Sequence, residues 1–91
     1  MATIHNLSAM PYAQAKVHIT EHTIYLVSYK TTVAYIDPEG WLIINGLYSA
    51  TTRKHIGAFM REYANATYQL AKQIYTDGYA YNIYTGEVVK L

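Results

Sequence analysis

The sequence predicts an α+β fold in which a small antiparallel sheet with a central hairpin packs against one or two helices. Between Val17 and Tyr48, short runs rich in β-branched and aromatic residues alternate with turn residues, as in antiparallel strands. From Ser49 onward, the apolar residues recur at helical spacing. A chain of 91 residues has room for one modest core, so we expect residues 1–91 to form a single domain.

The first half of the chain contains the strand signals. Residues 1–16 show no sustained period and are expected to be either a mobile arm or a strand that packs late. Two short strands, or one bulged strand, follow over residues 17–28, and another over residues 31–36. Residues 37–40, Asp-Pro-Glu-Gly, fit a type I turn. The nearly continuous apolar run at residues 41–48 predicts a central strand with both faces covered.

A first helix is predicted to begin after Ser49, which is a suitable N-cap residue. Its inner stripe at helical spacing consists of Thr52, Ile56, Phe59, Met60 and Tyr63. Lys54, Ala58 and Arg61 are expected to project away from this stripe. Arg53 and His55 are expected to flank it on its two edges.

A second helix is predicted to begin at Asn65 or Thr67 and to end at Gly78. Its expected inner face consists of Leu70, Ala71, Ile74 and Tyr75. The alternating residues 79–84 and the short run 87–89 are candidates for the last strands.

Composition limits the classes of function. A net charge of +1 argues against a general polyanion binder, although it permits a local cationic patch. The absence of cysteine excludes a disulfide framework and a thiolate metal site. No apolar segment reaches the roughly 18 residues of a membrane span, and no secretion signal is recognisable at the N-terminus. We therefore expect a cytoplasmic protein with no membrane partner.

The candidate ligand site lies where the last strand-like run meets the first helix. It comprises Ser49, Thr51, Thr52, Arg53, Lys54 and His55. A helix N-terminus attracts anions, and each basic side chain there costs about 0.3 to 1 kcal/mol when exposed. A bound phosphate would remove that cost and would find hydroxyl and amide donors nearby. The alternative is structural: Ser49 and Thr52 cap the helix, while Arg53 and Lys54 are solvated or pair with Asp37, Glu39 or Glu62.

Eleven tyrosines form the second notable feature. Tyr29, Tyr35 and Tyr48 lie on or beside the predicted sheet and are candidates for base stacking or for a protein interface. Packing into the core is the alternative for the whole set.

Catalysis and metal binding are not expected. His18 and His22 are four residues apart, but their surroundings are strand-like and no third ligand is evident. His55 lacks the nucleophile and orienting acid that a general base requires. The sequence thus predicts a protein that is not an enzyme and holds no cofactor.

Two segments carry a family resemblance, namely Ser28–Ala34, which fits SYxTxVA, and Tyr48–Ile56, which fits YSxTTxKHI. Over residues 24–63 the chain resembles a family of small uncharacterised bacteriophage and prophage proteins. The resemblance implies a phage accessory protein that inhibits or sequesters a host-defence component, such as a phosphate-bearing nucleotide signal. A protein inhibitor of a host nuclease, of the anti-CRISPR type, and a small nucleic-acid-binding protein are the alternatives. A homodimer is also compatible with open sheet edges.

Overall fold

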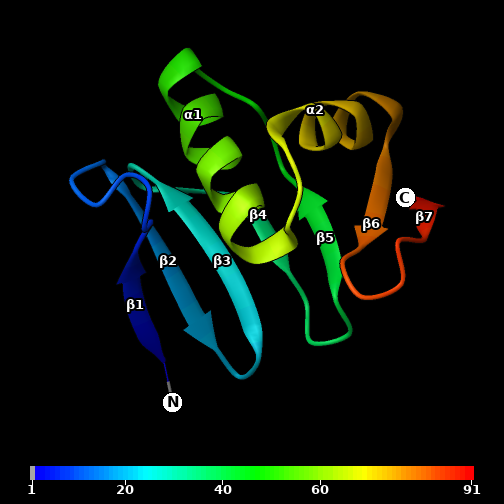
Figure 1. Ribbon diagram of the computed structural model, residues 1–91, viewed down its shortest axis with the longest axis horizontal. Helices are drawn as coiled ribbons and strands as arrows, with labels where there is room; N and C mark the ends of the chain where they lie inside the picture. The colour runs from blue at the N-terminus through cyan, green and yellow to red at the C-terminus, as the bar shows by residue number, and fades with distance from the viewer. Residues whose placement is uncertain (1) are drawn as a thin grey trace.

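The computed structural model describes residues 2–91, so Met1 lies outside the described chain. Seven strands form one sheet whose spatial order follows the sequence, and every neighbouring pair is antiparallel (Figure 1). The strands are β1 (Thr3–Asn6), β2 (Ala15–Thr20), β3 (Thr23–Ser28), β4 (Thr31–Ile36), β5 (Trp41–Ile44), β6 (Tyr79–Asn82) and β7 (Val88–Lys90).

All helical elements are inserted between β5 and β6 and cover one face of the sheet (Figure 1). They are α1 (Ala50–Phe59), the π-helix η1 (Met60–Ala64) and α2 (Tyr68–Asp77). Helix α1 packs against β3 and α2 packs against β5 and β6. This arrangement confirms the predicted α+β class, with a sheet packed against two helices. Across residues 2–91, no helix has both the length and the apolar character needed to cross a bilayer.

Within the N-terminal segment, residues 2–16 contain an edge strand. Strand β1 pairs with β2 in a register that places Thr3 opposite Ile19. Leu7 follows the strand and is fully buried in the core. The amide of Ser8 donates to Oε1 of Glu62 at 2.8 Å, which ties the following turn to η1. Of the two alternatives for this segment, these contacts correspond to a packed strand.

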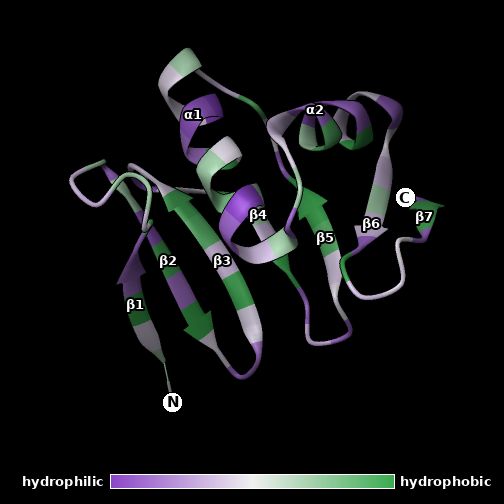
Figure 2. Cartoon of the chain, viewed as in Figure 1, coloured by the Kyte–Doolittle hydropathy of each residue, from purple (hydrophilic) through white to green (hydrophobic). Residues whose placement is uncertain are grey.

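Strands β2 and β3 alternate between a covered and an uncovered face, and Figure 2 shows the accompanying alternation of hydropathy along β2. Val17 and Leu26 are opposite each other and fully buried beneath the helices. The bulge lies between β3 and β4, where Leu26 pairs with Ala34 and the next pair joins Val27 to Thr32. Val33 is therefore the extra residue, and both it and Ala34 are buried.

Strand β5 is shorter than predicted and is covered on one face only. It ends at Ile44, and the following Asn45 donates its side-chain amide to the Thr32 carbonyl at 3.0 Å. Leu42 and Ile44 are buried, whereas Trp41 and Ile43 are half-buried on the face that no helix covers. A continuous apolar run therefore did not mean two covered faces, because both helices lie on the same side.

A turn is present at residues 37–40 as predicted, since the amide of Gly40 donates to the carbonyl of Asp37 at 3.0 Å. A buried amide joins this turn to the C-terminal hairpin: Asn82 donates to the Glu39 carbonyl at 3.1 Å and accepts from the Tyr84 amide at 2.9 Å. The ring of Tyr84 lies against Gly40, where an added Cβ would be 2.4 Å from its Cδ2. Gly40 also has a φ of +92°.

Replacing Gly40 by alanine should destabilise the protein through both its positive φ and the clash with Tyr84. The matched control is Gly86→Ala, because Gly86 has a similar φ of +78° but open space where its Cβ would be. We expect the control to lose about 1 kcal/mol and Gly40→Ala to lose more, because the exposed ring of Tyr84 must leave its position on Gly40. Urea denaturation measures both; equal losses would contradict the close packing of Tyr84 on Gly40.

Candidate functional site

The N-terminus of α1 is capped by Ser49, as predicted. Ser49 has an extended backbone, and its Oγ accepts a hydrogen bond from the amide of Thr52 at 3.2 Å. No acidic residue lies in the first turn. The capping interpretation therefore holds for Ser49.

A chain of hydroxyl groups runs from this cap into the protein. Oγ of Ser49 donates to Oγ1 of Thr52 at 3.3 Å, and Thr52 contacts Oγ of Ser28 at 3.0 Å. Ser28, the last residue of β3, lies 2.9 Å from Nδ1 of His55. Each hydroxyl has one proton to donate, so the chain is consistent if each donates to the next and neutral His55 accepts at Nδ1.

The hydroxyl chain contains four residues of the SYxTxVA and YSxTTxKHI segments, namely Ser28, Ser49, Thr52 and His55. Ser28, Thr52 and His55 are buried, with exposed fractions of 2%, 4% and 1%. They fasten the start of α1 to the end of β3. Thr52 and His55, predicted as ligand-binding residues, thus have internal partners and little surface to offer a ligand. His55 lies on the buried side of the helix and not on the edge of its inner stripe, and Ala58, which was expected to project outward, is also buried.

The three predicted tyrosines lie in three different surroundings. Tyr29 has a φ of +58°, is largely exposed, and its ring centroid lies 6.0 Å from that of His55. Tyr48 precedes the cap with a φ of +52°, and its ring packs on Gly46. Tyr35 lies on the uncovered face of the sheet, where it pairs with Tyr25 at 6.0 Å between ring centroids.

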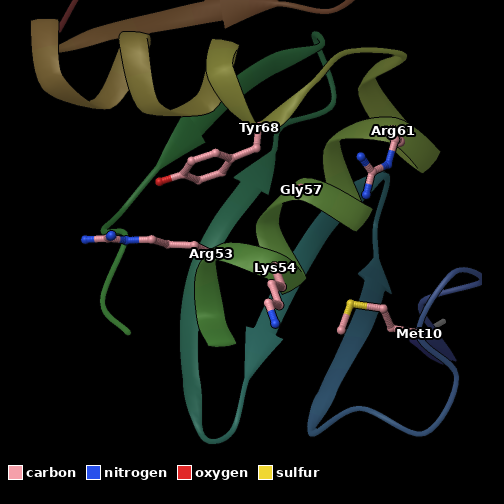
Figure 3. A pocket seen from close by; sticks show the side chains of 6 residues that line it. All are labelled: Met10, Arg53, Lys54, Gly57, Arg61 and Tyr68. Carbon is pink, nitrogen blue, oxygen red and sulfur yellow. The ribbon is translucent and has the colours of Figure 1, made fainter. Parts of the chain in front are cut away.

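A pocket opens on the solvent side of α1 (Figure 3). It has a volume of about 390 Å³ and is lined by Met10, Arg53, Lys54, Gly57, Arg61 and Tyr68. Of the predicted ligand-binding residues, Arg53 and Lys54 line it. Ser49 and Thr51 are exposed nearby in the chain but are not part of the lining.

Helical geometry explains why the cations share this pocket. At 3.6 residues per turn, positions 53, 54 and 57 lie within about 100° of arc on one side of α1, and Arg61 of the following η1 lines the same pocket. Tyr68 comes from the first turn of α2, and Met10 from the loop between β1 and β2. The helical spacing of the cations was visible in the sequence. The positions of Met10 and Tyr68 beside the cations were not visible in the sequence, because only the packing of separate elements brings these two side chains to α1.

The charge in the pocket is of one sign, since none of the lining residues is acidic. Two carboxylates that were candidates for pairing with Arg53 and Lys54 have backbone partners elsewhere. Asp37 accepts from the Glu39 amide at 2.9 Å, and Glu62 accepts from the Ser8 amide at 2.8 Å. The pocket is therefore suited to an anion.

Within residues 2–91, no three histidine or acidic side chains gather as they would around a metal ion. Burial lowers the pKa of His55, because the charged imidazolium is poorly solvated there. Burial raises the pKa of Tyr63, and the neighbouring Glu62 carboxylate adds to that effect.

The buried His55 predicts a pH dependence of folding. Its folded-state pKa is below the value of 6.5 that applies to the unfolded chain, so the unfolded state binds more protons as the pH falls. The stability is therefore fully present above pH 6.5 and decreases as the pH falls through that value, by at most about 1.4 kcal/mol per pH unit.

Urea denaturation between about pH 7.5 and 5 checks this expectation, since His55→Gln should flatten the dependence around the pKa of histidine. The matched control is His5→Gln in the exposed edge strand, which should retain the wild-type slope. An unchanged slope in the His55 variant would refute the assignment of the effect to this imidazole.

Neither the search of curated proteins nor the search of solved structures finds a matching relative. A family model described as a family of unknown function, DUF8033, matches residues 3–77, which span β1 to the end of α2 and include every residue of the pocket and of the hydroxyl chain. The chain belongs to this family of unknown function.

Proposed function

We propose that the chain is a non-enzymatic binding protein for a small phosphate-bearing ligand, and that the pocket on α1 is its binding site. The observation that carries the proposal is that Arg53, Lys54 and Arg61 line one pocket that contains no carboxylate. Phosphate oxygens accept charge-assisted hydrogen bonds from guanidinium and ammonium groups, which are about twice as strong as neutral ones. Tyr68 offers an aromatic ring beside these cations.

A nucleotide is the ligand class that combines both features, because its phosphate is an anion and its base can stack on an aromatic ring. The pocket replaces the helix N-terminus as the proposed site. The low overall charge of +1 favours a small ligand over a long nucleic acid. The biological part of the proposal is that a bacteriophage protein sequesters a nucleotide signal of host defence in the host cytoplasm. This part is supported by the resemblance of the SYxTxVA and YSxTTxKHI segments to those of small bacteriophage and prophage proteins.

Removing one cation from the pocket should weaken ligand binding. A hydrogen bond to a charged group contributes about 1.5 to 3 kcal/mol, so Lys54→Gln should weaken the affinity for a bound nucleotide roughly tenfold or more. Lys30→Gln is the matched control, because Lys30 is an exposed lysine in the turn after β3 and lies outside the pocket. Calorimetric titration measures both variants.

The ligand is found by heating the wild-type protein with a panel of linear and cyclic nucleotides. A ligand at 100 times its dissociation constant should add about 2.7 kcal/mol of stability. The proposal fails if no nucleotide raises the unfolding temperature, or if both lysine variants lose the same affinity.

The uncovered face of the sheet supports a second candidate function, inhibition of a host protein such as a nuclease. One row of side chains crosses five strands on this face: Ile4, His18, Tyr25, Tyr35 and Ile43. No helix covers the row (Figure 1), and tyrosine is enriched at protein interfaces.

Pull-down from a bacterial host with the wild type and with Tyr35→Ser should retain a stoichiometric nuclease only on the wild type. Equal retention, or none, counts against this function.

We also propose that the protein forms a homodimer through an edge of its sheet. The edge strand β1 is exposed along its whole length, and its unpaired backbone groups can pair with a second copy. Light scattering tests this, and a mass of one chain at micromolar concentration would reject it.

A further inference from the structure

We infer that the uncovered face of the sheet, on the side opposite the two helices, is a docking surface for a second copy of the chain, so that two sheets pack face to face. This contact differs from pairing at the edge strand β1 and goes beyond the binding of a nucleotide on α1. Three properties of the face carry the inference: its lack of charge, its area, and the positions of a hollow and of two large apolar side chains.

The strands of the sheet are almost free of charged side chains. None of the seven strands contains an aspartate or a glutamate, and Lys16 and Lys90 are their only lysines or arginines. Lys90 is paired with Tyr79, which packs against the core on the side that the helices cover. On the uncovered face, the ammonium of Lys16 donates to Oδ1 of Asn6 at 2.5 Å. Such a face does not repel a copy of itself and has little to offer a strongly charged partner.

Aromatic and aliphatic side chains occupy the middle of this face. Tyr25 and Tyr35 are paired across β3 and β4, and their ring centroids lie 6.0 Å apart. Trp41 and Ile43 of the neighbouring strand β5 are half-buried. Tryptophan and tyrosine contribute most to binding energy when they lie at the centre of an interface. A second sheet would remove the exposed part of these side chains from water.

The area of the face is sufficient for a small dimer interface. Seven strands at a spacing of about 4.8 Å give a width of roughly 30 Å, and strands of three to six residues are roughly 10 to 20 Å long. One copy therefore contributes roughly 500 Å², and a pair buries about 1,000 Å², which is near the lower limit for a specific interface. We therefore expect a dimer that dissociates on dilution.

The face is also complementary to itself about its middle strand, β4. A hollow of about 340 Å³ lies mainly over β2 and β3, whereas Trp41 and Ile43 belong to β5, on the other side of β4. A two-fold axis along β4 places β5 of each copy over β3 of the other, so the large side chains of one copy face the hollow of its partner. The hollow is lined by Ala2, His18, Thr20, Tyr25, Val27 and Thr32.

Thr32→Glu should halve the mass of the particle in solution. Thr32 is half-buried in β4, so the two-fold axis brings the new carboxylate close to its own copy, where like charges repel. Thr76→Glu is the matched control, because Thr76 is exposed on α2 and lies outside the face. Analytical ultracentrifugation over a dilution series measures the wild type and both variants, and circular dichroism establishes that each variant is folded.

Cross-linking tests the geometry without adding a charge. The chain contains no cysteine, so a single introduced thiol reports one position. A bismaleimide that spans about 10 Å, the distance between packed sheets, should join Thr32→Cys to its own copy. It should not join Lys72→Cys, which is exposed on α2. His5→Cys, in the edge strand β1, reports pairing at the edge.

A wild-type protein with the mass of one chain would overturn the inference, as would a folded Thr32→Glu variant that keeps the wild-type mass. Cross-linking through His5→Cys but not through Thr32→Cys would assign the dimer to the sheet edge. A nuclease bound in place of the second copy, and lost in Thr32→Glu, would assign the face to the second candidate function.

The outcome is independent of the proposed nucleotide site. The pocket on α1 lies on the helix side of the molecule and stays open in the face-to-face dimer (Figure 1). Thr32→Glu should therefore keep any shift of the unfolding temperature that a nucleotide produces in the wild type. Loss of the dimer with an unchanged shift separates the two surfaces, and loss of both together would contradict the face as a separate docking surface.

Discussion

The hydrogen-bonded chain from Ser49 through Thr52 and Ser28 to His55 is the interaction on which the position of α1 depends. Ser28, Thr52 and His55 are buried between the helix start and the end of β3, where unpaired polar groups would be costly, while Ser49 closes the chain at the surface. Every buried polar atom of this network has a hydrogen-bond partner, because no buried side-chain nitrogen or oxygen in the described residues lacks one. A satisfied polar network allows few alternative arrangements, so it fixes which side of α1 faces the sheet.

That constraint determines what the opposite side of the helix can do. With Thr52 and His55 turned inward, the intervening Arg53 and Lys54 face solvent. Gly57 of α1 and Arg61 of η1 line the same pocket. Helix α2 then follows closely enough for Tyr68 to become a wall of the pocket. The cationic pocket is thus a consequence of the buried network beneath it, even though the two share no residue.

The one-sided placement of the helices has a second consequence. Because α1 and α2 both lie between β5 and β6 in the sequence and return to the same face, the other face keeps its half-buried aromatic residues. Trp41 and Tyr35 belong to that face, although the apolar character of β5 predicted cover on both sides. The apolar character of a residue indicates that its side chain can be buried, but it does not indicate which neighbouring element covers that side chain.

Local chemistry in the sequence determined the elements: the Asp37–Gly40 turn, the Ser49 cap, the helix ending at Gly78 and the alternation in β2 and β3 were all predictable, because each depends on neighbouring residues. The same local pattern led to the prediction of an anion site at the helix N-terminus, because the sequence shows which residues carry hydroxyl and cationic groups but not which of these groups are buried. Only the tertiary structure decided that Ser28 of β3 would reach His55 of α1, and that Met10 and Tyr68 would form walls beside the cationic side of α1. Those contacts join residues far apart in the chain, and no local pattern encodes which distant side chain fills a given space.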